Sequence, residues 1–236
     1  MKFIYLLSAF SLLTMINIPD ANGQDNYDAN DWANLKYYQA ANHALPPADA
    51  GEERIVFMGN SITEGWIKSD PSFFAGKPYV NRGISGQTTP QMLIRFRQDV
   101  IDLHPTVVVL LAGTNDIAEN RGPTTLEAIY GNIISMAELA MVHDIRMVIC
   151  SVLPAHDYPW RPDLAPAEKI YALNKMLSSY CQLANIPYVD FHTPMSDQQK
   201  GLQKIYGEDG VHPNLTGYRF MEPLVEAGIA RALKRK

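Results

Sequence analysis

Apolar positions along the chain follow two patterns: short runs that are apolar on both faces, and longer segments with apolar residues at helical spacing. Residues 106–112 (TVVVLLA) illustrate the first pattern. Strands that are apolar on both faces lie inside parallel sheets that helices cover on both sides. The runs therefore predict five parallel strands, at residues 54–58, 78–81, 106–112, 146–152 and 186–191.

The segments between these runs contain signals for the start of a helix. The sequence TTP at 88–90 is typical of an N-cap with proline in the first turn, and TTLE at 124–127 is typical of a capping box. Pro166 and Pro213 are each predicted to open a further helix, the second of which runs towards the C-terminus. A helix therefore follows most of the predicted strands.

One more helix is predicted ahead of the first strand, over residues 32–41, with Asn30 or Asp31 as its cap. Strands that alternate with helices predict an α/β fold, here a three-layer αβα sandwich around a five-stranded parallel sheet. No internal repeat or low-complexity linker interrupts the pattern. Residues 24–236 are therefore predicted to form a single domain, in which residues 24–50 are an N-terminal extension with a packing helix.

The start of the chain has a different character. Lys2 precedes an apolar run over residues 3–18, and small residues follow at 21–23. A charged start, an apolar middle and a small-residue exit are typical of a secretory signal peptide. A membrane anchor is the alternative, but the run is short for a span and no stop-transfer charges follow it. The sequence thus predicts a signal peptide at 1–23, cleaved after Gly23, no membrane span after its removal, and an exported protein that is periplasmic or secreted.

Composition and charge narrow the classes of partner. Hydrophobic residues make up 47% and charged residues 19% of the 236 residues, which is ordinary for a globular protein. Lys and Arg number 20 against 25 Asp and Glu, a net charge of −5, and the only basic run ends the chain at 231–236. A nucleic-acid partner is excluded, because neutralising phosphates requires clustered cations.

The cysteines and histidines do not form a metal signature. The sequence has two cysteines, Cys150 and Cys181, both in apolar runs. Export would permit a disulfide, but buried free thiols are favoured because cysteine is among the most buried residue types. Neither C-x-x-C nor H-E-x-x-H occurs, so no metal site is predicted.

Polar residues capable of chemistry follow four of the predicted strands. In open α/β sheets, ligands bind beyond the carboxyl ends of the strands. Ser61 follows the first strand, Gly83 lies in the turn after the second, Asn115 follows the third, and Asp209 and His212 come after the fifth. Taken singly, each has a structural alternative: a helix cap, a tight turn, an Asx turn, or a capping Asp with a surface His.

The four segments occur together in an order that resembles the GDSL or SGNH hydrolases, a family of serine esterases. The matching segments are Gly59-Asn60-Ser61-Ile62, Gly83, Gly113-Thr114-Asn115-Asp116 and Asp209-Gly210-Val211-His212. The resemblance extends from about residue 54 to the C-terminus and implies the flavodoxin-like strand order 2-1-3-4-5. Many members have Asp where this chain has Asn60.

The resemblance also implies roles for these residues. Ser61 would be the nucleophile, His212 the general base and acid, and Asp209 the partner that orients the imidazole. The oxyanion hole would consist of the Ser61 N–H, the Gly83 N–H and the Asn115 side chain. Ser61 would attack an ester carbonyl and form an acyl-serine intermediate that water hydrolyses, with no metal or organic cofactor.

The substrate class is predicted from the export signal, the aromatic residues and the family. The run GNSITEGW at 59–66 looks most like the relatives of platelet-activating-factor acetylhydrolase, whose members favour short acyl chains. Trp66 and Trp160 are candidates for stacking on a sugar or a short acyl chain; the alternative is that these rings pack on the protein, since large aromatic residues are mostly buried. The predicted enzyme removes acetyl or other short acyl groups from a small-molecule or glycan ester. The alternatives are a lysophospholipase or thioesterase of the same fold, or a carbohydrate-binding protein without turnover. No oligomeric state is predicted.

Overall fold

The computed structural model describes residues 29–234, and its strands form a single parallel sheet. The strand order is β2-β1-β3-β4-β5, which confirms both the α/β class and the predicted order. The register is continuous, with Gly59 of β1 opposite Gly83 of β2 and Leu111 of β3. The strands are β1 (Ile55–Gly59), β2 (Tyr79–Gly83), β3 (Val107–Leu111), β4 (Arg146–Cys150) and β5 (Tyr188–Val189).

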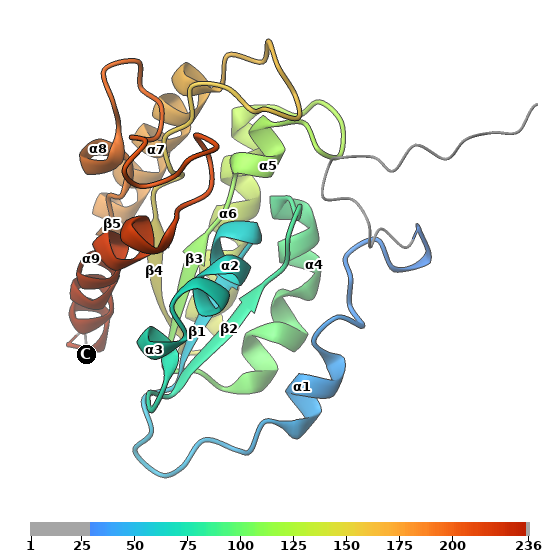
Figure 1. Cartoon of the computed structure of the whole chain (residues 1–236). Coiled ribbons are helices and arrows are strands. Elements are labelled where there is room, and N and C mark those ends of the chain that lie inside the picture. Colours follow the sequence, from blue (N-terminus) through green and yellow to red (C-terminus); the bar gives the residue numbers. More distant parts are fainter. Residues whose placement is uncertain (1–28, 235–236) are drawn as a thin grey trace, which may run out of the picture.

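Helices cover both faces of the sheet, which gives the predicted three layers (Figure 1). The longer helices are α2 (Ser61–Ser69), α4 (Thr89–Asp99), α6 (Leu126–Val142), α7 (Pro166–Leu183) and α9 (Leu215–Leu233). The short ones are α1 (Gln39–Ala44), α3 (Pro71–Phe74), α5 (Thr114–Ile117) and α8 (His192–Met195), with 3-10 turns at Ala29–Asp31 and Ile101–Leu103.

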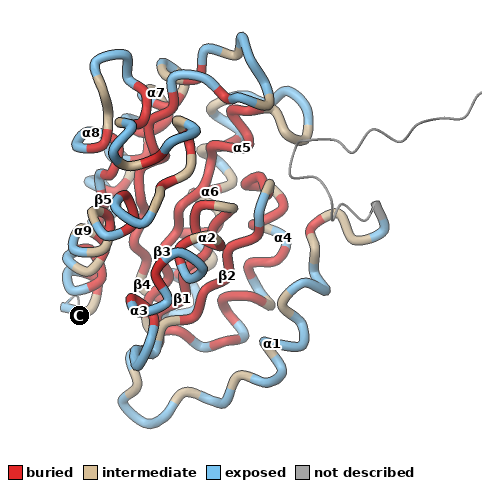
Figure 2. Tube along the Cα trace, in the orientation of Figure 1, coloured by how far each residue is buried: buried red, intermediate tan, exposed pale blue. Residues whose placement is uncertain are grey.

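Two apolar cores flank the sheet because alternate residues of each strand point to opposite faces. Val56 and Met58 of β1 pack in one core with α4, α6 and α7, whereas Ile55 and Phe57 pack in the other with α2, α3 and α9. Figure 2 shows the buried strands between helices whose outer sides are exposed. Cys150 and Cys181 are buried free thiols, as the sequence analysis favoured.

Two predicted helices differ from the structure. The helix expected over residues 32–41 is replaced by turns and the short α1, because both oxygens of Asp31 accept backbone N–H groups, from Leu35 and Lys36. Asn34 adopts a left-handed conformation (φ 53°) that interrupts a helix. The last helix begins at Leu215 rather than Pro213, because the Asn214 side chain caps it by accepting the Gly217 N–H (2.9 Å).

The described part of the chain contains no helix that is both long and apolar enough to cross a membrane. The predicted signal peptide at 1–23 lies outside the described residues.

Candidate active site

Ser61 lies at the carboxyl end of β1, where the strand turns directly into α2. Asn60 caps this helix, since its Oδ1 accepts the Ile62 N–H (3.0 Å), and Ser61 is the first helical residue. The turn requires glycine at position 59, because a Cβ there would lie 2.8 Å from the Leu111 carbonyl oxygen. Because Asn60 supplies the cap, the Ser61 hydroxyl is not needed for capping. The Ser61 N–H is among the groups that the start of a helix leaves without an intrahelical partner.

The loop before α9 brings a histidine to this serine. The His212 Nε2 atom lies 3.0 Å from Ser61 Oγ, and the His212 Nδ1 atom lies 2.7 Å from Asp209 Oδ2. The other carboxylate oxygen of Asp209 accepts the N–H groups of Val211 (2.9 Å) and His212 (2.8 Å). The Asp209 carboxylate thus shapes the turn and orients the imidazole. The three predicted residues, Ser61, His212 and Asp209, therefore form a continuous chain of hydrogen bonds.

The charge of Asp209 is strongly favoured in this setting. Partial burial on its own would raise the pKa of the carboxyl group. The hydrogen bonds from the His212 ring and from the two backbone N–H groups outweigh burial and lower the pKa of Asp209 to about 2. A carboxylate that is ionised at neutral pH beside Nδ1 favours the tautomer in which Nε2 can accept a proton from Ser61.

Asn115 is held in one orientation at the carboxyl end of β3. Its Nδ2 donates to the Gln87 carbonyl oxygen (2.9 Å), and its Oδ1 accepts from Asn120 Nδ2 (3.0 Å). The Asn120 Oδ1 atom in turn accepts from Trp160 Nε1 (3.0 Å). An amide nitrogen carries two hydrogens, so Asn115 keeps one N–H for a ligand.

The structure contradicts the prediction that the Gly83 N–H is a free oxyanion donor. That N–H is buried and donates to Asn81 Oδ1 (2.9 Å). Glycine is needed at position 83 for packing, because a Cβ would lie 2.2 Å from the Glu64 nitrogen at the start of α2. In the following turn, Gly86 has a φ of +74°, and its N–H has no hydrogen-bond partner within residues 29–234. Gly86 could have been found from the sequence, because Gly83 and Gly86 bracket the same short turn after β2.

The two tryptophans predicted to contact substrate lie in different environments. Trp66 is only 2% exposed and packs against Phe73 and Tyr218, so the prediction that it stacks on substrate is wrong. Trp66 points into the core because α2 buries this face against α3 and α9. Trp160 is half-buried, and its ring centre lies 6.0 Å from that of His212. Trp160 therefore lies at the candidate site.

Sequence reasoning missed Glu64, which ties the turn after β2 to α2. Its Oε2 accepts both the backbone N–H (2.7 Å) and the hydroxyl (2.5 Å) of Ser85, and its Oε1 accepts from Tyr37 and Lys68. Burial opposes the charge, but the hydrogen bonds from Lys68, Ser85 and Tyr37 prevail and lower the pKa of Glu64. Ser85, which precedes Gly86, is thereby held against α2, the helix that begins at Ser61.

Asp116 of α5 is buried and links this short helix to α4. Its carboxylate accepts from the Thr89 nitrogen (2.9 and 3.0 Å) and from the Thr89 hydroxyl (2.6 Å). Desolvation is the largest influence and raises the pKa of Asp116 to about 6, although the bonds from Thr89 act in the opposite direction.

This raised pKa predicts a pH dependence of stability. The unfolded chain releases the Asp116 proton near pH ~4, whereas the folded protein keeps it until about pH 6, so ionisation costs stability as the pH rises between these values. We expect Asp116→Asn to gain up to ~3 kcal/mol in free energy of unfolding relative to wild type over this interval. Urea denaturation of both proteins from pH 4 to 7 measures this difference, and a difference independent of pH would refute the assignment.

Within residues 29–234, no group of three or more His, Cys, Asp or Glu side chains is arranged to hold a metal ion.

Comparisons with known proteins agree with the fold and identify the family. The sequence profile of the GDSL-like Lipase/Acylhydrolase family matches residues 57–220. A GDSL-like lipase from Bacteroides thetaiotaomicron has a similar solved structure, with a TM-score of 0.83 and 47% identity over 85% of this chain and 98% of that one. Esterase TesA from Pseudomonas aeruginosa is 25% identical over 170 residues, 70% of this chain and 78% of TesA.

Lipoprotein YqeF from Bacillus subtilis is 27% identical over 121 residues, which are 44% of this chain and half of YqeF. The family profile, together with the similarity to esterase TesA, defines the class of the protein as a carboxylic ester hydrolase. The chain belongs to the GDSL-like lipase/acylhydrolase family.

Proposed function

We propose that this protein is an exported serine esterase that removes acetyl or other short acyl groups, from carbohydrate, through an acyl-serine intermediate. The observation that carries the proposal is the continuous contact from Ser61 Oγ to His212 Nε2 (3.0 Å) and from His212 Nδ1 to Asp209 Oδ2 (2.7 Å). A serine hydroxyl is a weak nucleophile unless an adjacent base accepts its proton. The export signal at 1–23 and a single hydrolase domain over 24–236 are part of the proposal.

In the proposed mechanism, His212 accepts the Ser61 proton as Ser61 attacks the ester carbonyl. The tetrahedral oxyanion is held by the Ser61 N–H, the free N–H of Asn115 and the Gly86 N–H, which takes the place first assigned to Gly83. The imidazolium then donates its proton to the leaving alcohol. Water, deprotonated by His212, attacks the acyl-serine carbonyl; the bond to Ser61 Oγ breaks, the imidazolium returns its proton to that oxygen, and the acid leaves.

Trp160 supports the preference for short acyl groups. Its indole nitrogen donates to Asn120 (3.0 Å), so the ring is fixed 6.0 Å from the imidazole and forms a rigid wall beside the nucleophile. A flat aromatic surface also suits the apolar face of a sugar ring. Activity should be compared on p-nitrophenyl acetate, butyrate, octanoate and palmitate, and on an O-acetylated oligosaccharide. Preference for acetate and release of acetate from the oligosaccharide would support the proposal, whereas rates that rise towards palmitate would favour the lysophospholipase or thioesterase alternative.

The proposed role of Asn115 can be tested separately. Asn115→Ala should lower kcat by about 10²–10³ with little change in KM, because an oxyanion donor acts mainly on the transition state. Steady-state kinetics on p-nitrophenyl acetate give both constants. A rise in KM alone would assign Asn115 to ground-state binding.

A further inference from the structure

A segment ahead of the sheet binds along α4, outside the region that the family profile matches. This N-terminal strap, residues 32–42, runs beside α4 in Figure 1 and is largely exposed on its outer side in Figure 2. Three glutamine side chains donate their Nε2 hydrogens to its backbone carbonyls. The pairs are Gln87 with Ala33 (2.8 Å), Gln91 with Trp32 (2.6 Å) and Gln98 with Leu35 (2.6 Å).

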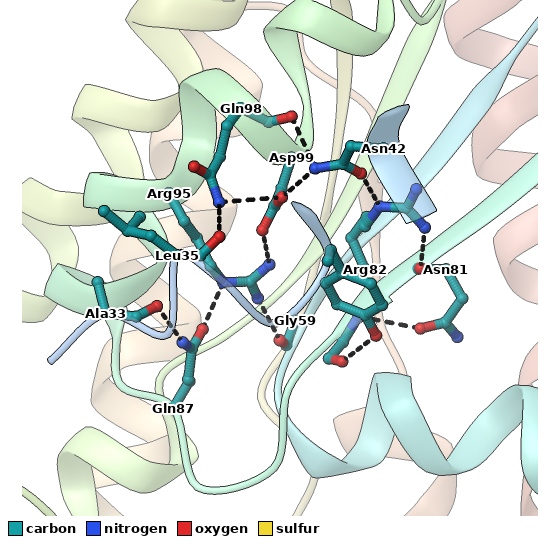
Figure 3. Close-up of polar contacts among 12 residues, drawn as sticks. Ala33, Leu35, Asn42, Gly59, Asn81, Arg82, Gln87, Arg95, Gln98 and Asp99 are labelled. Atoms are coloured by element: carbon teal, nitrogen blue, oxygen red, sulfur yellow. Dashed lines mark hydrogen bonds and ion pairs between the residues drawn. The ribbon is translucent and has the colours of Figure 1, made fainter. Parts of the chain in front are cut away.

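Behind the strap, the α4 residues Arg95 and Asp99 form an ion pair that is buried from solvent. Arg95 is fully buried (0% exposed), and its guanidinium donates to Asp99 Oδ2 (3.0 Å), the Gly59 carbonyl oxygen (3.0 Å) and Gln87 Oε1 (Figure 3). The second oxygen of Asp99 accepts from Asn42 of the strap (2.6 Å). The ion pair is thus satisfied on both sides, as a buried charge requires.

Gln87 is the point at which this network meets the candidate active site. Its side chain is held at both ends, with Oε1 bound by Arg95 and Nε2 bound to Ala33. Its backbone carbonyl accepts from Asn115 Nδ2 (2.9 Å), and Gly86 precedes it. Arg95 at the same time holds the carbonyl of Gly59, two residues before Ser61. The network therefore connects the turn between β1 and α2, where Ser61 lies, to the Asn115 side chain.

We propose that Gln87 is a positioning residue for the ester hydrolase reaction: clamped between Arg95 and the N-terminal strap, it fixes the carbonyl that orients Asn115. The proposal rests on the proposed function, in which Asn115 stabilises the oxyanion. The position of an oxyanion donor affects the rate more than substrate binding, since a displacement of about 1 Å can lower the rate on the order of 100-fold.

The test compares Gln87→Met with Gln98→Met as its matched control. Both changes remove a glutamine amide that holds the strap, but the Gln98 amide donates to Leu35 (2.6 Å) and, at 3.5 Å, to Asp99, and it forms no hydrogen bond with Arg95 or Asn115 within residues 29–234. Gln87→Met should lower kcat about 10- to 100-fold with KM within about twofold of wild type, whereas Gln98→Met should leave kcat unchanged. Equal kcat for Gln87→Met and wild type would overturn the proposal. If the methionine variant does not fold, Gln87→Asn, one methylene shorter, tests the same contacts.

A double-mutant cycle separates positioning from general damage. In an Asn115→Ala background, Gln87→Met should cost much less in kcat than in wild type, because the group through which it acts is gone. Losses that multiply in full would overturn the proposal.

Hydrogen–deuterium exchange of residues 84–88 provides a readout that does not depend on turnover. Faster exchange in Gln87→Met than in Gln98→Met supports the clamp, and identical exchange overturns it. Failure of the proposed function is distinguishable, because it would appear as wild-type turnover that survives Ser61→Ala.

Discussion

Ser61→Ala should lower kcat/KM for ester hydrolysis by at least ~10⁴ while leaving the fold intact. The change removes one oxygen, the atom 3.0 Å from His212 Nε2. Asn60, not Ser61, caps α2, and alanine is the best helix former, so the helix has no reason to lose stability. Thermal unfolding should therefore be unchanged, and labelling by a fluorophosphonate should be lost.

Ser85→Ala is the matched control for this experiment. Ser85 lies on the neighbouring turn, and its hydroxyl donates to Glu64 Oε2, which its backbone N–H also contacts. Because the backbone contact with Glu64 remains, we expect kcat/KM for ester hydrolysis to fall by less than about tenfold, which is the scale of one hydrogen bond. An inactive Ser85→Ala together with an active Ser61→Ala would overturn the assignment of the nucleophile.

Asp209→Asn should lower kcat by about 10⁴ without unfolding the protein. The asparagine oxygen can still accept the N–H groups of Val211 and His212, so the turn before α9 is kept. The amide NH₂, however, would face His212 Nδ1 and favour the tautomer whose Nε2 carries the proton. That tautomer cannot accept a proton from Ser61.

The comparison with His212→Ala makes this second prediction decisive. His212→Ala should be at least as damaging as Asp209→Asn, because it removes the proton acceptor itself. A folded Asp209→Asn with lower kcat than His212→Ala would mean that Asp209 acts directly on substrate or water. Because its hydrogen bonds lower the pKa of Asp209 to about 2, its carboxylate remains charged in mild acid, and titration of Asp209 should not lower activity there.

The strands and several helix starts were predictable because they depend on local properties of the sequence. The segment at 106–112 is apolar on both faces because β3 is buried on both sides of the sheet. Thr88 and Thr125 cap their helices through contacts within a few residues. The predicted N-terminal helix over 32–41 was too long. The spacing of apolar residues does not reveal that the Asp31 side chain binds the backbone N–H groups of Leu35 and Lys36 in a non-helical conformation.

The sequence by itself determined the α/β class, and its resemblance to the GDSL hydrolases indicated the family and the candidate residues Ser61, Asn115, Asp209 and His212, which follow buried strands and are therefore expected at one edge of a parallel sheet. Only the tertiary structure decided which glycine keeps a free N–H and which tryptophan lies beside the imidazole. The same holds for the partners of Gln87, which include Ala33, 54 positions away, and Asn115, 28 positions away. Such contacts form between groups distant in the chain, and local patterning does not encode them because packing of the helices against the sheet fixes their geometry.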